Sequence, residues 1–507
     1  MDGLDQASGF GRSRYLYALP DQSVLGLQKV VCQSFNYTHN LYIDAPEPVV
    51  TRPLRQTVFS HHNLLCTMDF IGLIRGILGI SVILGIALVI SNNRSQISWR
   101  TVAAGLGLQI FLAIFILKGD AMGAWFAPLG WPKMFVSWVS SFFVLVLNYT
   151  TAGATFIFGD LAKPVGTPGS MGQFFAFQVL PTIIFFGSLM AVLYHLGVMQ
   201  KIVQGMASLV SRFLGTSGAE SLSVTANIFV GQTEAPLVVR PYLDQMTMSE
   251  LLAVMTGGMA TIAGGVMAAY IQILGDPYAV ANGLALDAGR LVFAEQLLSA
   301  SVMAAPAALL LAKIMIPETG EPETRGGATI AVEKTAANVI DAAANGASDG
   351  LKLSLNVGAM LLAFLALIAM LNAILGWGTG LFGFAITLES LLGWVVSPLA
   401  WIVGVPWADA VQFGSLIGTK IIANEFVAYL NLADLITSNA ISPKTILMAT
   451  FALCGFANLS SIAIQIGGIG PLAPGRKADL AKLGVRAVIA GSLANLMTAT
   501  IAGVLAG

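Results

Sequence analysis

The sequence is poor in charged residues. Asp, Glu, Lys and Arg make up 10% of its 507 residues, whereas an average soluble domain carries about 25%. Hydrophobic residues make up 56%, and this composition excludes an ordinary soluble domain. A net charge of −1 also gives no basic surface that would attract nucleic acid, so we expect no nucleic-acid partner.

Cysteine and histidine are scarce as well. The chain holds Cys32, Cys66, Cys454, His39, His61, His62 and His195. Neither residue type shows the spacing of a disulfide framework or of a zinc site. The Ser/His and metal-binding motifs of intramembrane enzymes are also missing. We therefore predict a protein that is not an enzyme and needs no resident cofactor.

Long apolar runs dominate the chain instead. The mean hydropathy is +0.79, and a transmembrane helix needs about 20 apolar residues. The runs predict an all-α polytopic membrane protein, embedded in lipid, with eight spans at 71–91, 101–117, 174–197, 249–273, 297–315, 348–376, 444–470 and 484–506. The aromatic, amphipathic stretch 132–148 is typical of a helix that lies at the membrane surface.

The composition also divides the chain. Residues 1–67 hold no run long enough to cross a membrane, which predicts a disordered extension or a start assigned too early, before Met68. After them we expect 68–198 with the first spans and the surface helix, 199–315 as a first repeat with a hairpin at 217–243, 316–386 as a linker with a scaffold span, and 387–507 as a second repeat with a hairpin at 408–435.

A polar interruption defines the first hairpin. Gly231 permits a turn, Thr233 is a favourable N-cap, and Pro236 fits the first turn of a helix. We predict a re-entrant hairpin whose second helix starts at Glu234. A carboxylate at membrane depth is costly unless it lines a cavity or meets a partner, so Glu234 indicates a binding site.

The second hairpin repeats this pattern with Asn424 before Glu425. A short helix, a hairpin and two spans occur in the same order in 199–315 and 387–506, with one span between them, which predicts that the second copy is inverted. Inverted repeats with broken helices are typical of secondary transporters. A pair of structural acids, held by helix caps and Lys420, is the simpler alternative, but it leaves the recurrence unexplained.

Each hairpin precedes a span with a polar, glycine-containing middle, at 261–266 and 456–468. Asn458 and Ser461 could serve only as hydrogen-bonding contacts between helices, which are common in membranes. Together with the hairpins, however, these spans predict a polar site with two carboxylates. Such a site suits a small solute with hydroxyl and amide groups, together with a cation.

Three motifs resemble those of the concentrative nucleoside transporter family. They are GQTEAPLVVRPY at 231–242, NEFVAY at 424–429 and CGFANLSSIAIQIGGIG at 454–470. The likeness runs from about Met68 to Gly507. It implies a cation-coupled nucleoside symporter, with sodium favoured, that imports nucleosides by alternating access and assembles as a homotrimer through the span at 348–376.

The resemblance also implies residue roles. It assigns the nucleobase to Gln232, Thr233, Glu234 and Val266. It assigns the ribose to Glu425, Phe456, Asn458 and Ser461. It assigns the coupling sodium ion to Asn227, Val230, Thr261 and Ile262, which offer oxygen ligands of the kind that hard cations prefer.

Other functions remain open at the level of the sequence. A proton could replace sodium by loading a buried glutamate, and a nucleobase could replace the nucleoside. A passive channel or receptor is a further alternative. The residues do not rank purine against pyrimidine nucleosides. No organelle signal is recognisable, which favours the inner membrane of a bacterium.

Overall fold

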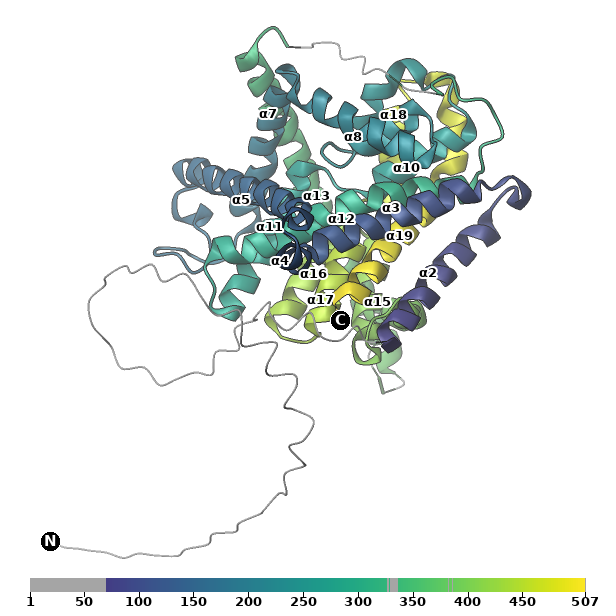
Figure 1. Cartoon of the computed structure of the whole chain (residues 1–507). Coiled ribbons are helices and arrows are strands. Elements are labelled where there is room, and N and C mark those ends of the chain that lie inside the picture. The colour runs from purple at the N-terminus through teal and green to yellow at the C-terminus, as the bar shows by residue number, and fades with distance from the viewer. Residues whose placement is uncertain (1–69, 326–327, 329–335, 382, 385, 507) are drawn as a thin grey trace, which may run out of the picture. The chain divides into compact units, whose positions relative to one another are not determined.

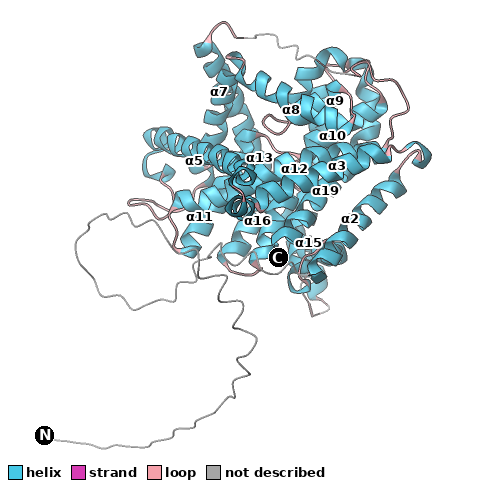
Figure 2. Ribbon diagram, in the orientation of Figure 1, coloured by secondary structure: helices cyan, strands magenta, loops and turns pink. Residues whose placement is uncertain are grey.

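The computed structural model describes residues 70–325, 328, 336–381, 383–384 and 386–506, and these residues form helices and no strand. The predicted extension at 1–67 lies outside them. Figures 1 and 2 show the helices. Up to the first hairpin they are α2 (Phe70–Ile90), η3 (Arg94–Gln96), α3 (Trp99–Leu117), α4 (Gly119–Trp125), η4 (Ala127–Gly130), α5 (Trp131–Phe158), η5 (Gly159–Ala162), α6 (Phe175–Gln178), α7 (Leu180–His195) and α8 (Val198–Leu214).

The remaining helices contain both predicted repeats. They are α9 (Gly218–Ala226), η6 (Ala235–Tyr242), α10 (Met248–Ala260), α11 (Gly264–Asn282), α12 (Leu286–Met315), α13 (Val339–Gly380), α14 (Leu388–Ile402), η7 (Trp407–Asp409), α15 (Ala410–Ile422), α16 (Glu425–Thr437), α17 (Pro443–Leu453), α18 (Leu459–Ile469), η8 (Pro474–Arg476) and α19 (Lys477–Ala506). The series α8, α9, η6, α10, α11, α12 recurs after α13 as α14, α15, α16, α17, α18, α19. The predicted repeat is therefore present in the order of the elements.

Eight helical stretches in the described residues are long and apolar enough to cross a membrane, and the predicted number is confirmed. Their membership differs in two places. The predicted span 444–470 is not one helix, because α17 ends at Leu453 and α18 begins only at Leu459. The predicted surface helix 132–148 is part of α5, which has 28 residues and counts among the eight. A position of α5 at the membrane surface stays a prediction.

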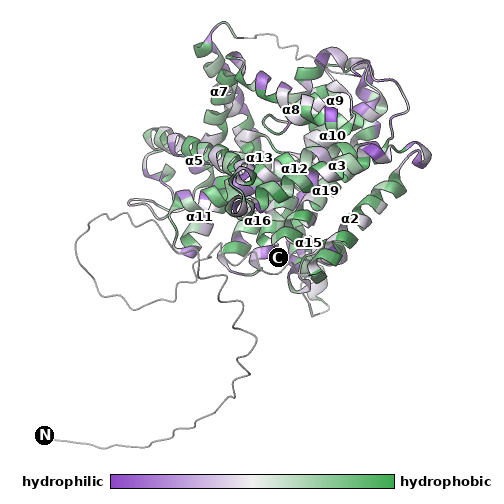
Figure 3. Cartoon of the chain, viewed as in Figure 1, coloured by the Kyte–Doolittle hydropathy of each residue, from purple (hydrophilic) through white to green (hydrophobic). Residues whose placement is uncertain are grey.

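The helices differ sharply in burial. In the most apolar stretch of α12, 94% of the residues are buried, compared with 11% in that of α13. Helix α12 packs against α3, α10, α11 and α19, so it forms the centre of the packed core. Figure 3 shows that both helices are largely hydrophobic. Apart from the face that packs against α7, most of the apolar surface of α13 is therefore left uncovered by the described part of this chain.

Helices α10 and α17 both stop inside the core, next to the hairpins. Helix α10 is capped by Thr247 and ends at Ala260, after which Thr261 is extended and α11 restarts at Gly264. Helix α17 is capped by Ser442 and ends at Leu453, and Gly455 then adopts a φ of +159°. Asn458 caps the restarted helix α18. These two interruptions confirm the predicted broken helices.

The first hairpin departs from its prediction in the second arm. Its first arm, α9, is capped by Ser217 and ends beside Asn227. The second arm is the 3-10 helix η6, with Glu234 rather than Thr233 at the cap position and no side-chain capping bond. Pro241 lies inside the segment and lacks an N–H group, so the segment cannot build a regular series of α-helical hydrogen bonds. The prediction of an N-cap at Thr233 is wrong.

The second hairpin follows its prediction closely. Its arms α15 and α16 are both α-helices of 13 residues. Asn424 caps α16, because its side-chain oxygen accepts a hydrogen bond from the N–H of Val427 at 3.0 Å. Glu425 is therefore the first residue of a properly started helix, and its carboxylate lies at the favourable, positive end of the helix dipole.

Candidate functional site

Glu425 is the centre of a buried hydrogen-bond network. Its side chain is 4% exposed. One carboxylate oxygen accepts a hydrogen bond from the hydroxyl of Tyr270 at 3.0 Å, and the other accepts one from the amide of Asn458 at 2.8 Å. Buried charges are tolerated when they are hydrogen-bonded in this way. Helices α16, α11 and α18 thus meet at this carboxylate.

Asn458 extends the network toward the first hairpin. Its side-chain oxygen accepts a hydrogen bond from the N–H of Ser461 at 2.8 Å, so the cap of α18 and the contact to Glu425 use the same amide group. The hydroxyl of Ser461 accepts a hydrogen bond from the Nε2 of Gln232 at 3.2 Å. A continuous chain of polar contacts therefore joins the second hairpin to the tip of the first.

The side-chain oxygen of Gln232 is left without a hydrogen-bond partner in the described part of the protein. Its side chain is buried, and its Oε1 has no hydrogen-bond partner among the residues that the structure describes. The neighbouring Gln465 has a buried Oε1 in the same condition within the described chain. Buried acceptors of this kind normally have partners, so the two oxygens are candidate acceptors for a ligand or water.

The remaining predicted substrate residues differ in burial and in their contacts. Val266 is buried on α11, one turn before Tyr270, and Phe456 is buried in the break before α18. Thr233 contacts the backbone near Gly468, since a Cβ on that glycine would lie 2.6 Å from the Thr233 Cγ2. Glu234 is exposed; its backbone oxygen accepts a hydrogen bond from the N–H of Leu237 at 3.0 Å, and no hydrogen bond to its carboxylate is found among the described residues. The carboxylate of Glu234 is thus more accessible than that of Glu425, and its role in substrate binding stays a prediction.

The predicted sodium ligands Asn227 and Thr261 lie in direct contact. The hydroxyl of Thr261 donates to the backbone oxygen of Asn227 at 3.1 Å and to that of Gly257 at 2.9 Å. The side-chain Oδ1 of Asn227 is buried and unpartnered within the described residues. Ile262 is fully buried and Val230 half-buried beside them. An unused amide oxygen next to a hydroxyl and loosened backbone fits a hard cation.

Other kinds of metal site find no support in this part of the chain. Across the described residues, no group of three or more His, Cys, Asp and Glu side chains is arranged to hold a metal ion. The predicted site around Asn227 would offer neutral oxygens only. Such ligands suit a weakly bound monovalent ion better than a resident divalent one.

Sequence reasoning missed two polar residues of this region, Tyr270 and Asn495, and considered a third, Lys420, only as a neutralising charge. Tyr270 lies four residues after Val266, on the same face of α11, and this spacing could have revealed it. Asn495 is a lone amide in the apolar α19, which is itself a functional signal in a membrane protein. Its contacts with the broken helices are long-range and could not be read from the sequence.

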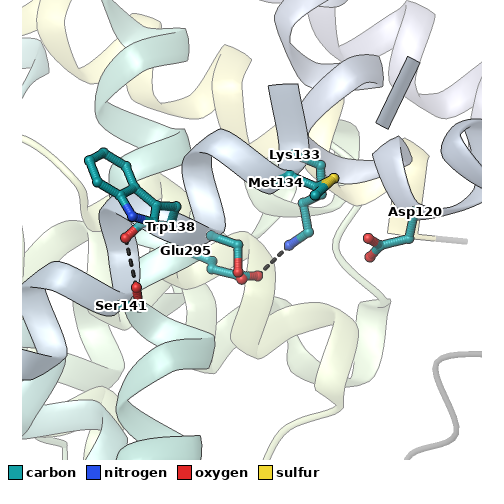
Figure 4. A pocket seen from close by; sticks show the side chains of 7 residues that line it. Asp120, Lys133, Met134, Trp138, Ser141 and Glu295 are labelled. Carbon is teal, nitrogen blue, oxygen red and sulfur yellow. Dashed lines mark hydrogen bonds and ion pairs between the residues drawn. The ribbon is translucent and has the colours of Figure 1, made fainter. Parts of the chain in front are cut away.

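A separate cavity of about 450 Å³ lies away from these residues. It is lined by Asp120, Lys133, Met134, Ser137, Trp138, Ser141 and Glu295. Figure 4 shows Lys133 paired with Glu295 across it. The cavity contains none of the predicted substrate or sodium residues, and Lys133 and Glu295, two of its three charged residues, pair with each other. It is therefore not a candidate for the main site.

Three family models match parts of the chain, and two of them describe the same family. Residues 78–161 match the Na+ dependent nucleoside transporter N-terminus, residues 176–277 match a domain described as nucleoside recognition, and residues 296–503 match the Na+ dependent nucleoside transporter C-terminus. Both hairpins and both broken helices lie within the matched ranges.

Several whole proteins are similar over the same region. An uncharacterized transporter of Bacillus subtilis, YutK, is 47% identical, with 84% of this chain and 98% of YutK covered. The nucleoside permease NupC of Helicobacter pylori is 41% identical, with 85% and 97% covered. Sodium/nucleoside cotransporter 2 of Rattus norvegicus is 39% identical, with 84% of this chain and 62% of the rat protein covered.

Solved structures agree with the fold. The transporter CNTnw in an inward-facing, substrate-bound state is 44% identical, with a TM-score of 0.75 and coverage of 86% of this chain and 98% of CNTnw. A CNTnw variant in an outward-facing state is 45% identical, with a TM-score of 0.76 and the same coverage. The matching protein has therefore been captured open to either side of the membrane.

Proposed function

This chain belongs to the Na+-dependent nucleoside transporter family, and we propose that its nucleoside and its sodium ion bind between the two hairpins and the two broken helices. The chain is a multi-pass membrane protein that couples nucleoside transport to sodium by alternating access. The family is one of transporters, and its bacterial members support the inner membrane of a bacterium as the location.

The observation that carries the proposal is the contact chain from Glu425 through Asn458 and Ser461 to Gln232. It supports a ribose site at the Glu425 end, lined by Phe456. A carboxylate held by two donors still has acceptor capacity for the vicinal hydroxyls of a ribose. The other half, Gln232, Thr233, Glu234 and Val266, would then face the nucleobase. The free Oε1 of Gln232 supports this assignment, because an amide can serve base edges of either polarity.

The coupling sodium ion would bind next to the base site, at the tip of the first hairpin. Its ligands are the Oδ1 of Asn227, the Thr261 hydroxyl and the backbone oxygens of Val230 and Ile262. The contact between Asn227 and Thr261 supports this site. Because Asn227 and Gln232 belong to one short tip, ordering of the tip by sodium also orders the base-binding side chain. This linkage provides the thermodynamic coupling between the two ligands.

The hairpins and the exposed α13 have consequences in the membrane. The packed arms α9 with η6 and α15 with α16 would be re-entrant, because non-helical backbone at membrane depth must face protein or water. We also infer a homotrimer built on α13. Large exposed side chains such as Leu355, Leu362 and Trp377 support this inference, and the rest of this surface would face lipid. Cross-linking in the native membrane should stop at three copies.

Uptake of radiolabelled uridine into proteoliposomes tests the function. We expect accumulation under an inward sodium gradient and its loss when the gradient is abolished. Accumulation driven by a proton gradient instead would select the proton-coupled alternative. A lack of uridine uptake, together with uptake of a free nucleobase, would select a nucleobase transporter. No uptake of either solute under any cation gradient would overturn the proposal.

A further inference from the structure

Lys420 is a fully sequestered cation in the second hairpin. Its side chain is 1% exposed. The ammonium donates to the backbone oxygen of Ala452 at 2.9 Å and to the side-chain oxygen of Asn495 at 2.8 Å. Ala452 lies in the last turn of α17, where the helix dipole presents its negative end. The carboxylate of Glu425, at the start of the next arm, attracts the same charge.

Asn495 connects this lysine to both broken helices. Its Nδ2 donates to the backbone oxygen of Ala260 at 2.7 Å and to that of Cys454 at 2.6 Å. Ala260 is the last residue of α10, and Cys454 follows the last residue of α17. The two donations fix the amide so that its oxygen faces Lys420. A single side chain of α19 therefore joins the ends of α10 and α17 and orients the lysine site.

The two repeats use comparable places for two cations. In the first repeat, the proposed sodium site lies between the tip end of arm α9, at Asn227, and the end of α10, at Thr261. In the second repeat, the ammonium lies between the tip end of arm α15, at Lys420, and the end of α17, at Ala452. Each place offers one amide oxygen and backbone oxygens beside a broken helix.

We propose that the ammonium of Lys420 is a tethered cation, which stands in the second repeat where the transported sodium ion stands in the first. The inference rests on the proposed sodium site. The ammonium uses the Ala452 and Asn495 oxygens, so no second sodium ion binds there. The end of α17 and the nearby Glu425 are therefore neutralised in every state of the cycle. The corresponding place beside α10 is neutralised only when sodium is bound, so each nucleoside is accompanied by one sodium ion.

The ratio of transported ions tests the wild-type protein without any mutation. Uridine is uncharged, so parallel uptake of radiolabelled sodium and radiolabelled uridine into proteoliposomes gives the coupling ratio. We expect one sodium ion per uridine. Sodium-driven uptake with a ratio of two would overturn the tethered cation and leave the proposed function intact. A lack of sodium-driven uptake would instead count against the proposed function.

Removal of the tethered charge gives a second test. In Lys420→Met, the oxygens of Ala452 and Asn495 become free to bind an ion. We expect the dependence of uptake on sodium concentration to change from a Hill coefficient near one to a value approaching two. The rise of the melting temperature per decade of sodium should also about double, because a second ion now stabilises the folded state. Lys420→Arg keeps the charge and should keep a coefficient near one.

Lys201→Met, which removes an exposed lysine of α8, is the matched control and should leave both sodium dependences unchanged. A folded Lys420→Met protein whose melting temperature responds to sodium as the wild type does would overturn the proposal, even if its transport were lost. If this variant failed to fold, the ion ratio of the wild-type protein would still decide the question.

Discussion

The two hairpins share an order of elements but differ in how completely they are built. The second has two α-helical arms, a capped start at Asn424, and a buried Glu425 whose oxygens both accept hydrogen bonds. The first has a 3-10 arm, a long tip at 227–234 and an exposed Glu234. Two buried oxygens of the first tip, on Asn227 and Gln232, lack partners within the described chain.

This difference assigns different tasks to the two halves. In the second half, both carboxylate oxygens of Glu425 already accept hydrogen bonds and the cation is part of the chain, although Gln412 and Gln465 also have unpartnered buried oxygens within the described residues. The first half has acceptors that a ligand must satisfy, because an unpaired buried polar group costs about 1–3 kcal/mol. Binding of sodium and nucleoside to the first half would therefore lower the free energy of the tip at 227–234. Ligands can shift a conformational equilibrium only through such differential interactions.

The largest expected effect comes from the second half. Glu425→Gln removes the negative charge to which Tyr270 and Asn458 donate hydrogen bonds. Hydrogen bonds to charged groups contribute about 1.5–3 kcal/mol. We expect the ratio of maximal rate to KM for uridine uptake to fall by about 10- to 150-fold. Asp434→Asn, an exposed carboxylate on the same helix, should have little effect. Near-normal uridine uptake by Glu425→Gln would remove the ribose site from this hairpin.

The thermal stability of glycine variants tests the same difference between the two halves. A Cβ on Gly455 would lie 2.6 Å from the Asn495 oxygen and 2.7 Å from the backbone oxygen of Met259, and the φ of Gly455 is +159°. Gly455→Ala should therefore destabilise the fold by about 1–3 kcal/mol or more, as backbone strain of this kind does. The melting temperature in detergent reports this loss.

The matched variant is Gly231→Ala in the first tip. The nearest atom to its new Cβ is the carboxylate of Glu234, which can move away, so the melting temperature should change much less. Equal losses in the two variants would mean that the first tip is as rigidly packed as the second break. The proposed difference in rigidity between the second repeat and the first would then be contradicted.

The sequence predicted those parts of this site that depend on local signals. Capping residues determine where helices start, and the start predicted after Asn424 is confirmed. The cap of the second arm of the first hairpin was mispredicted, and Pro241 inside this arm disfavours a regular α-helix. The contacts of Tyr270 and Asn495 depend on packing between distant segments. No local pattern determines which side chains such packing brings together, although the family motifs did select Glu425, Asn458, Ser461 and Gln232.

A smaller effect, on the sodium dependence of uptake alone, should distinguish the ion site from the substrate site in the first half. Asn227→Ala removes the unpartnered oxygen, and a single hydrogen-bonding group contributes about 0.5–1.5 kcal/mol. We expect the half-saturating sodium concentration for uptake to rise by about two- to tenfold, with an unchanged uridine KM at saturating sodium. Thr261→Ser keeps the hydroxyl and should behave as the wild type. A raised uridine KM with unaltered sodium dependence would place Asn227 in the substrate site.

The smallest effect is expected for the residue whose sequence context first indicated a binding site. Glu234→Gln changes a carboxylate that is exposed in this structure, and exposed charges contribute little because water screens them. Uridine uptake should fall by about fivefold or less. A loss as large as that of Glu425→Gln would show that Glu234 becomes buried during the transport cycle. The first hairpin would then close over the nucleoside, and the asymmetry between the two halves would belong to one state of the cycle only.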